Sequence, residues 1–243
     1  MQANSQFKFE VFFLNVRGIR AQRKRTSIFS FLKDQNANIY FLQETYSERS
    51  DENIWKKQWG GKLFCSHGTK HSKGVCILIN PTMQLQVDCR YSNSLGRVVV
   101  VITISRNGQK VTLCNIYAPN DQANQLQFLQ ELNNCIIDKT ELTSLILGGD
   151  WNCTLTKKDK MGSAPWKPTT YSNLISITIE LFDLIDIQRV RHPKLRKFTY
   201  ESKSLRLKSI RDFFLIAKDL TVYIKKCEKR PISTDFHFCN LAK

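Results

Sequence analysis

Residues 145–152 join an apolar run to two glycines, a carboxylate, an aromatic residue and an amide. The apolar run is typical of a strand buried on both faces, and the glycines allow a tight turn at its end. Asp150 and Asn152 are two residues apart, so in an extended chain their side chains point the same way. The segment predicts a carboxylate and an amide at the C-terminal rim of a sheet, where layered α/β folds bind ligands.

Taken alone, these eight residues also fit an ordinary polar turn after a core strand. Other polar residues at strand ends favour the chemical interpretation, and they are Asn15, Glu44, Tyr117, Asp212, Asp235 and His237. Carboxylates without a cluster of cysteine and histidine suit a hard divalent ion such as Mg²⁺, with Mn²⁺ as the alternative. An acid or an imidazole beside such an ion would activate water, so the set predicts hydrolysis of a phosphate ester.

The charge of the chain points to the kind of substrate. The 243 residues include 37 Lys plus Arg and 21 Asp plus Glu, which gives a formal net charge of +16. Such an excess favours a polyanionic partner, most often nucleic acid and sometimes an anionic membrane surface, whereas solubility alone needs a net charge of about 2–8. Together with the candidate metal site, this predicts phosphodiester hydrolysis on nucleic acid.

Several other classes of protein are disfavoured. The sequence contains no P-loop, nucleophile elbow or dinucleotide-binding glycine fingerprint. No apolar stretch approaches the roughly 20 residues that span a bilayer, and residues 1–8 lack a signal-peptide core. We therefore expect an intracellular protein without a membrane segment.

The cysteines form no CxxC pair and lack zinc-ligand spacing. Most of them lie in apolar surroundings, so we expect buried, reduced thiols in a reducing compartment. The eight are Cys65, Cys76, Cys89, Cys114, Cys135, Cys153, Cys227 and Cys239.

The elements that would position the polar residues are many short strands and two or three clear helices. Strands are expected at residues 8–15, 39–42, 74–80, 84–91, 96–105, 110–117, 198–200, 208–216 and 232–241, besides the opening segment. Helical spacing marks residues 27–33, 121–140 and 171–183. Turns are expected at Gly60-Gly61 and Asn107-Gly108, and a basic loop at 154–168. The pattern fits one α/β domain over residues 1–243, with helices outside two stacked sheets.

Six short motifs occur in order across nearly the whole chain. They are Leu14-Asn15-Val16-Arg17-Gly18-Ile19, Gln43-Glu44-Thr45, Asn115-Ile116-Tyr117-Ala118-Pro119, Gly148-Gly149-Asp150-Trp151-Asn152, Phe198-Thr199-Tyr200 and Ser209-Ile210-Arg211-Asp212-Phe213-Phe214. Each is weak alone, but the ordered set resembles the exonuclease–endonuclease–phosphatase superfamily. Within it, the chain is most similar to the endonuclease domain of LINE-type (non-LTR) retrotransposons. That similarity is carried by the doubled glycine before Asp150, the Tyr-Ala-Pro-Asn turn and the run Leu184-Ile185-Asp186-Ile187 followed by His192-Pro193.

The resemblance implies a four-layered α/β sandwich of the DNase I type. It implies a Mg²⁺-dependent endonuclease that nicks one strand of double-stranded DNA, so that the freed 3′-hydroxyl primes reverse transcription. It also implies a monomer that acts in the nucleus after cytoplasmic synthesis, is not secreted, and shares a full-length polyprotein with a reverse transcriptase domain. Two alternatives remain open: an abasic-site DNA repair endonuclease, and a catalytically weakened, DNA-binding copy of the domain.

The resemblance also implies a role for each matching residue. Glu44 would bind the metal with help from Asn15. Asp150 would align or activate the attacking water, and Asn152 would hold the scissile phosphate with it. Tyr117 would contact the phosphate or its leaving group.

Two departures from the family pattern affect the last motifs. The family's fifth motif ends in basic–Ile–Asp, whereas here the order is Ile210-Arg211-Asp212. The family's last motif has adjacent Asp and His, whereas here Phe236 separates Asp235 from His237. Asp212 would pair with His237 or the metal, and His237 would stabilise the phosphorane-like transition state. Because successive strand residues face opposite ways, we hypothesise that this copy is catalytically weakened or uses a β-bulge.

The remaining matches are DNA contacts. Lys160 follows Asp159 and matches a family Asp-Arg position that touches DNA, and residues 196–208 match a hairpin that inserts into a DNA groove. Their cations would contact phosphates, which position DNA without specifying its sequence. The expected DNA-binding residues are Arg17, Asn120, Lys160, Lys203, Arg206, Ser209 and Arg211.

Overall fold

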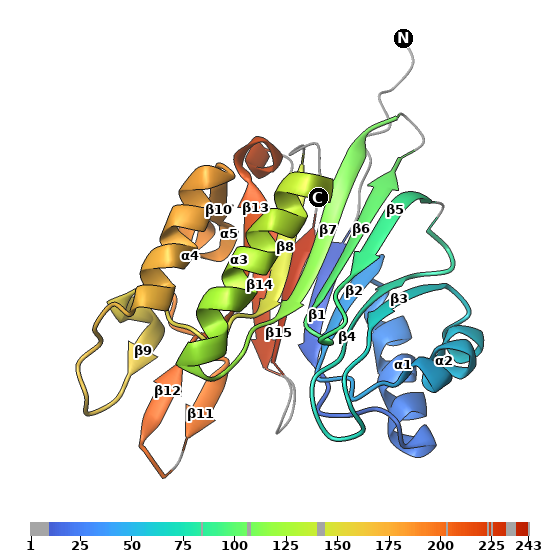
Figure 1. Cartoon of the computed structure of the whole chain (residues 1–243), viewed down its shortest axis with the longest axis horizontal. Coiled ribbons are helices and arrows are strands. Elements are labelled where there is room, and N and C mark those ends of the chain that lie inside the picture. The colour runs from blue at the N-terminus through green and yellow to red at the C-terminus, as the bar shows by residue number, and fades with distance from the viewer. Residues whose placement is uncertain are drawn as a thin grey trace.

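Two six-stranded sheets pack face to face, and helices cover the outer face of each sheet (Figure 1). The computed structural model describes residues 10–83, 85–105, 108–139, 144–202, 204–222, 224, 226–231 and 237–242, with the backbone alone for 139, 226, 228–231 and 237–242. The layers confirm the predicted four-layered α/β sandwich. In the described parts of the chain, no helix has the length and hydropathy that crossing a membrane requires.

The two sheets differ in how their strands are ordered. The first consists of β14 (Lys226–Pro231), β15 (His237–Ala242), β1 (Glu10–Asn15), β2 (Ile39–Gln43), β4 (Val75–Ile79) and β3 (Lys62–Ser66). The second consists of β10 (Leu184–Asp186), β13 (Asp212–Ala217), β8 (Leu145–Asp150), β7 (Lys110–Tyr117), β6 (Val98–Ile104) and β5 (Gln86–Ser92). A small third sheet contains β11 (Tyr200–Ser202), β12 (Leu207–Ser209) and β9 (Lys160–Met161).

The helices of the described residues lie in two groups (Figure 1). One group covers the first sheet and contains α1 (Gln22–Gln35) and α2 (Glu52–Trp59), with the 3₁₀ turn η1 (Arg49–Asp51) before α2. The other covers the second sheet with α3 (Gln122–Lys139) and α4 (Thr170–Leu181), and α5 (Ile187–Arg191) contacts β13. The turns η2 (Lys157–Asp159) and η3 (Lys218–Val222) precede β9 and follow β13.

Strand β1 shows why the sheets are apolar on both faces. Val11 and Phe13 enter the cluster between the sheets, whereas Phe12 and Leu14 enter the cluster beneath α1 and α2. Successive strand residues face opposite ways, so a strand covered on both sides reads as a continuous apolar run. Across the central layer, the rings of Phe13 and Phe214 have centroids 4.8 Å apart, which joins the two sheets.

The directions of the strands bring the candidate residues to one end of the sandwich. Strands β1 and β2 are parallel, as are β7 and β8, so Asn15, Glu44, Tyr117 and Asp150 lie at or just beyond C-terminal strand ends. Strand β13 is antiparallel to β8 and begins with Asp212 at that end. The sequence analysis predicts the candidate catalytic residues at this rim.

The prediction of a turn at the doubled glycine is wrong, because Gly148 and Gly149 lie inside β8. A side chain at Gly148 would overlap the ring of Phe214, and one at Gly149 would overlap the carbonyl of Ile116. Gly149 also has a φ of 141°, which favours glycine. The glycines therefore permit the close approach of β7 and β13 to β8.

The expectation that all eight cysteines are reduced thiols is also wrong. Cys65 and Cys76 form a disulfide between β3 and β4, where they are direct cross-strand partners with Cα atoms 4.2 Å apart. They are 11 residues apart in sequence, and only the strand register brings them together. Of the other cysteines with described side chains, Cys89 is exposed and Cys114, Cys135, Cys153 and Cys227 are buried, all as free thiols.

Candidate active site

Glu44 lies directly beyond β2 and is held by two donors. The Nδ2 of Asn15 donates to its Oε1 at 2.8 Å, and the hydroxyl of Tyr46 donates to its Oε2 at 2.9 Å. Burial raises the pKa of Tyr46 to about 12, and the Glu44 carboxylate adds to the shift, so the phenol stays a donor. Asn15 and Glu44 thus meet as predicted, whereas sequence reasoning missed Tyr46, whose only signal is its position two residues after Glu44.

The loop after β1 supports the same carboxylate residue. The amide of Gly18 donates to the carbonyl of Glu44 at 2.6 Å, and Gly18 has a φ of 78°. A Cβ atom on Gly18 would lie 2.5 Å from the ring of Tyr46. Glycine at this position therefore lets Tyr46 pack close enough to reach Glu44.

Tyr117, Asp150 and Asp212 form a row across three adjacent strands of the second sheet. Tyr117 of β7 is the register partner of Asp150 of β8, and Asp150 is the register partner of Asp212 of β13. Removal from water raises the pKa of Asp150 well above its usual range, and the negative charges of Asp212 and Glu44 add to this shift. Burial likewise raises the pKa of Tyr117, followed by the charges of Glu44 and Asp150, so its hydroxyl stays protonated.

The influence of Glu44 on both Asp150 and Tyr117 shows that the two sheets contribute to one site. The buried side-chain amides of Gln43 and Asn115 hold the two sheets together next to the site. The Nε2 of Gln43 donates to the Oδ1 of Asn115 at 2.6 Å, and the Nδ2 of Asn115 donates to the carbonyls of Leu42 and Cys76 at 3.0 and 2.9 Å. These bonds join β2 and β4 to β7 directly beneath Glu44 and Tyr117. Asn115 lies in a quoted motif, but its role between the sheets was not predicted.

Arg97 is a second residue that sequence reasoning missed. Its guanidinium donates to the carbonyl of Tyr117 at 3.0 Å and lies 5.4 Å from the centroid of the Tyr117 ring. The amide of Tyr117 in turn donates to the carbonyl of Arg97 at 2.9 Å. Arg97 therefore positions Tyr117, and its positive charge opposes the rise in the pKa of that phenol.

Asn152 reaches the site by a different route from the one expected. Strand β8 ends at Asp150, and Asn152 adopts a left-handed conformation with a φ of 47°. Its backbone amide donates to the Asp150 carboxylate at 2.9 Å, and its Nδ2 donates to the carbonyl of Ala118 at 2.8 Å. The two side chains are adjacent because the chain turns here, and not because an extended strand continues.

A cavity of about 270 Å³ beside Asn152 gathers three of the expected DNA-binding residues. Lys160, Ser209 and Arg211 line it together with Asn152. The guanidinium of Arg211 lies 3.7 Å from the centroid of the Tyr200 ring, and its Nε donates to the hydroxyl of Ser209 at 3.1 Å. The exchanged order of Ile210 and Arg211 therefore leaves Asp212 in register with Asp150 and directs Arg211 to this cavity.

The other expected residues are more dispersed. Arg17 and Asn120 are exposed beyond β1 and β7, and Arg206 is exposed in the turn of the hairpin formed by β11 and β12. Lys203 and Asp235 lie outside the described residues, as does Phe236. Strand β15 starts at His237, one register step beyond the pair of Leu14 and Phe238, at the end of β1 that carries Asn15.

The residues present fit a hard divalent ion. Glu44 and Asn15 offer carboxylate and amide oxygen atoms from adjacent strand ends. In the described ranges, no three His, Cys, Asp or Glu residues lie close enough to form a metal cage. Mg²⁺ is usually held by one or two carboxylates, with water and substrate phosphate completing its coordination, so it suits this donor set. Glu44 and Asn15 are the residues that would hold such an ion.

The sequence matches a known family over most of its length. The endonuclease/exonuclease/phosphatase family matches residues 12–177. A transposon TX1 uncharacterised 149 kDa protein of Xenopus laevis is 31% identical over 189 residues. That match covers 77% of this chain but only 14% of the frog protein, so the chain spans a small part of that relative.

Solved structures share the fold over nearly all of the chain. The AP endonuclease LMAP from Leishmania major has a TM-score of 0.79 at 14% identity and covers 97% of this chain and 87% of its own. The endonuclease domain of TRAS1, a telomere-specific non-LTR retrotransposon, has a TM-score of 0.70 at 18% identity, with coverages of 97% and 98%. The 3′ phosphatase NExo from Neisseria, bound to a product DNA hairpin, has a TM-score of 0.76 at 17% identity, with coverages of 96% and 98%. At these identities the likeness concerns the fold.

Proposed function

The chain belongs to the endonuclease/exonuclease/phosphatase family, and we propose that it is a metal-dependent DNA endonuclease of a non-LTR retrotransposon. In this proposal it nicks one strand of double-stranded DNA, and the freed 3′-hydroxyl primes reverse transcription. The similarity to the transposon protein and the shared fold of the TRAS1 domain support this assignment. The small share of the frog protein that is matched supports a polyprotein with further domains, and a reverse transcriptase domain on it is part of the proposal.

One observation carries the proposal. Glu44 at the end of the first sheet lies close enough to the row of Tyr117, Asp150 and Asp212 in the second sheet to help raise the pKa of Asp150 and of Tyr117. A cluster of carboxylates kept partly out of water is unfavourable unless a cation or a substrate offsets it. Such perturbed groups at a sheet rim are typical of a catalytic site.

The protein's own residues supply the steps around the phosphate. Asp150, with its raised pKa, takes a proton from the attacking water. Tyr117 stays protonated and donates a hydrogen bond to the phosphate or to the leaving oxygen. The Nδ2 of Asn152 has a second hydrogen beyond the one bonded to Ala118, and this hydrogen contacts the scissile phosphate.

Glu44 and Asn15 would hold the metal, and the hydrogen bonds from Asn15 and Tyr46 orient the Glu44 carboxylate. When bound, a divalent ion such as Mg²⁺ supplies positive charge to the phosphate and the leaving oxygen. The site is closed on one side by Lys160 and Arg211, whose cations contact the DNA backbone beside the cut.

A plasmid assay tests the proposal. We expect supercoiled DNA to become nicked circles in Mg²⁺ and to stay supercoiled in EDTA. A second pair of substrates, intact and abasic duplexes of one sequence, separates the alternatives, because an abasic-site endonuclease cuts only the second. Binding of both duplexes without cutting in Mg²⁺ or Mn²⁺ would instead identify a catalytically weakened copy and contradict the proposal.

A further inference from the structure

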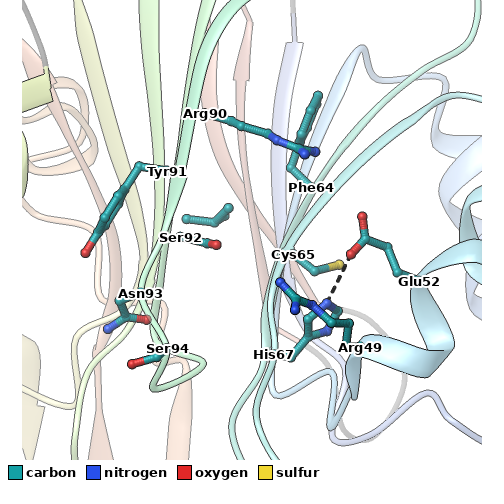
Figure 2. Close-up of a pocket in the computed structure, with 11 residues that line it drawn as sticks. Arg49, Glu52, Phe64, Cys65, His67, Arg90, Tyr91, Ser92, Asn93 and Ser94 are labelled. Carbon is teal, nitrogen blue, oxygen red and sulfur yellow. Dashed lines mark hydrogen bonds and ion pairs between the residues drawn. The ribbon is translucent and has the colours of Figure 1, made fainter.

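A cavity of about 550 Å³ opens between β3 and β5, which are edge strands of the two sheets (Figure 2). We call it the edge pocket and define it by Arg49, Phe64, His67, Arg90, Asn93 and Ser94. Figure 2 shows Arg90 reaching from β5 toward Phe64 of β3, with Arg49 and His67 on the side of the first sheet. The pocket is separate from the cavity beside Asn152, because no residue lines both.

The two arginines of the edge pocket have no direct partner for their guanidinium groups in the described part of the chain. No ion pair or hydrogen bond joins the guanidinium of Arg49 or of Arg90 to any described residue. The pocket contains one carboxylate, Glu52, and His67 holds it with Nε2 3.2 Å from its Oε2. One guanidinium group from η1 and one from β5 therefore face the cavity without an ion-pair partner among the described residues, which favours an anionic ligand.

Neutral donors complete the lining. The Oδ1 of Asn93 is used by Ser66, Arg97 and Val98, which fixes the residue and leaves its Nδ2 without a partner among the described residues. The hydroxyl of Ser94 is exposed at the rim. Guanidinium, amide and hydroxyl donors together are the groups that contact DNA phosphates. The volume exceeds that of one phosphate group, so sugar or base atoms next to the phosphate also fit beside Phe64.

The edge pocket lies at the same end of the sandwich as the candidate active site. Strand β3 is antiparallel to β4, which is antiparallel to β2, so β3 and β2 end on the same side. The hydroxyl of Ser47, three residues beyond Glu44, lies 3.1 Å from the Nδ1 of His67. On the other sheet, Asn93 is four residues before Arg97, which positions Tyr117. Three or four residues span at most about 14 Å, so both routes from the pocket to the catalytic residues are short.

We propose that the edge pocket binds a backbone phosphate of the DNA substrate within about one helical turn (~34 Å) of the position that is cut. Arg49 contacts that phosphate from η1 and Arg90 contacts it from β5, and Asn93 donates to it. The contact sets the register of the duplex on the rim and rests on the proposed function. Because the phosphate is the group recognised, the contact weakens when that one phosphate is made neutral.

A scan with methylphosphonates, which neutralise one phosphate at a time, tests the proposal. Duplex binding is measured in EDTA, so that no strand is cut, for the wild type, Arg49→Ala, Arg90→Ala and the double variant. We expect one position at which neutralisation weakens the wild type about tenfold and the double variant less than twofold. The double variant, which loses the contact with that one phosphate, lowers the slope of log affinity against log salt by about 0.9. Lys218→Ala, at the opposite end of β13, is the control and keeps the wild-type pattern.

The outcomes separate this proposal from the proposed function. If neutralising each phosphate changes the affinity of the double variant as much as that of the wild type, the edge pocket binds no DNA phosphate. This conclusion would hold even if the wild type nicks plasmid. If neutralising one phosphate weakens binding by the wild type but not by the double variant, the pocket proposal holds. It would hold even if the wild type does not nick plasmid. The assignment to DNA is also overturned if Arg49 and Arg90 bind inorganic phosphate or a mononucleotide but no phosphate of the duplex depends on them. Thermal unfolding of each variant confirms that it is folded.

Discussion

Asp150 is placed where a carboxylate is costly. It lies in register with Asp212, close to Glu44, and its own backbone neighbour Asn152 supplies only one amide donor at 2.9 Å. Like charges out of water raise one another's pKa and destabilise the folded chain. Such an arrangement is retained at sites where a cation or substrate completes it, so stability and activity oppose each other here.

We predict that Asp150→Asn stabilises the protein at pH 8 while removing activity. A carboxyl group whose pKa is raised on folding contributes stability below its unfolded pKa of about 4, and that stability is lost as the pH rises through the folded pKa. The variant should therefore unfold at least about 2–4 °C higher than the wild type at pH 8. The difference should shrink toward pH 4. Thermal unfolding in EDTA across this range measures it, and a variant that is less stable at every pH contradicts the account.

Tyr46 provides a test of how Glu44 is oriented. Tyr46→Phe removes the 2.9 Å hydrogen bond to Oε2 and leaves the ring packed against Gly18. Loss of a residue that orients a metal ligand typically lowers metal affinity about 10–100-fold. We expect a higher Mg²⁺ concentration for half-maximal nicking, with the rate restored at saturating Mg²⁺. A lower maximal rate with unchanged Mg²⁺ dependence would place Tyr46 elsewhere in the mechanism.

The separation of Asp235 from His237 by Phe236 remains a prediction about activity. If the histidine is misplaced by one strand position, the double exchange Phe236→His with His237→Phe should increase plasmid nicking, by about 10²-fold or more where the imidazole is essential. Phe236→His alone is the matched comparison. The absence of any gain would reject the misplacement.

At the scale of elements, β8 determines how closely the strands of the second sheet approach one another. Gly149 has a positive φ and no room for a side chain beside Ile116, whereas Gly60 has a φ of 80° and nothing within 4 Å of its Cβ position. Gly149→Ala should destabilise the protein by about 2–4 kcal/mol, and Gly60→Ala by about 1 kcal/mol. Urea unfolding compares the two. Equal losses would mean that strain at φ, and not the close packing of β7 on β8, explains Gly149.

The strands that carry the site could be predicted because each is a continuous apolar run that ends in a polar residue. The limits expected for β7, residues 110–117, are those observed, and β2 and β4 differ by one residue or so. Helix α2 was missed because its eight residues bury only Trp55 and Trp59 while Ile54 is 59% exposed, which hides the helical period. Short elements carry too few residues for periodicity to decide.

The partners of the site residues could not be predicted in the same way. That Asn15 meets Glu44 follows from two neighbouring parallel strands, which the motifs suggested. The contacts of Arg97 with Tyr117 and of Gln43 with Asn115 depend on strand register and sheet packing, across 20 and 72 residues of sequence. The disulfide between Cys65 and Cys76 depends on register too. Pairings of this kind arise from tertiary structure and leave no local pattern in the sequence.

At the scale of the whole molecule, charge and fold act together. In the proposed function, a net charge of +16 would draw DNA to the protein. The strand directions bring the candidate catalytic residues, the cavity beside Asn152 and the edge pocket to one end. Lys and Arg residues of the two cavities therefore lie on both sides of Asp150 and Glu44, where they could contact a bound duplex. The treatment of residues 1–243 as one domain and the expected monomer remain predictions.

Nicking of supercoiled plasmid by four matched proteins tests the central claim most directly. Glu44→Gln and Asp150→Asn each differ from the wild type by one heavy atom in the candidate site, and the control Asp183→Asn removes an exposed carboxylate that pairs with Lys218 at the opposite end of β13. We predict Mg²⁺-dependent nicking by the wild type and by Asp183→Asn, and rates at least about 100-fold lower for Glu44→Gln and Asp150→Asn. Nicking at the wild-type rate by Glu44→Gln or Asp150→Asn would contradict the account.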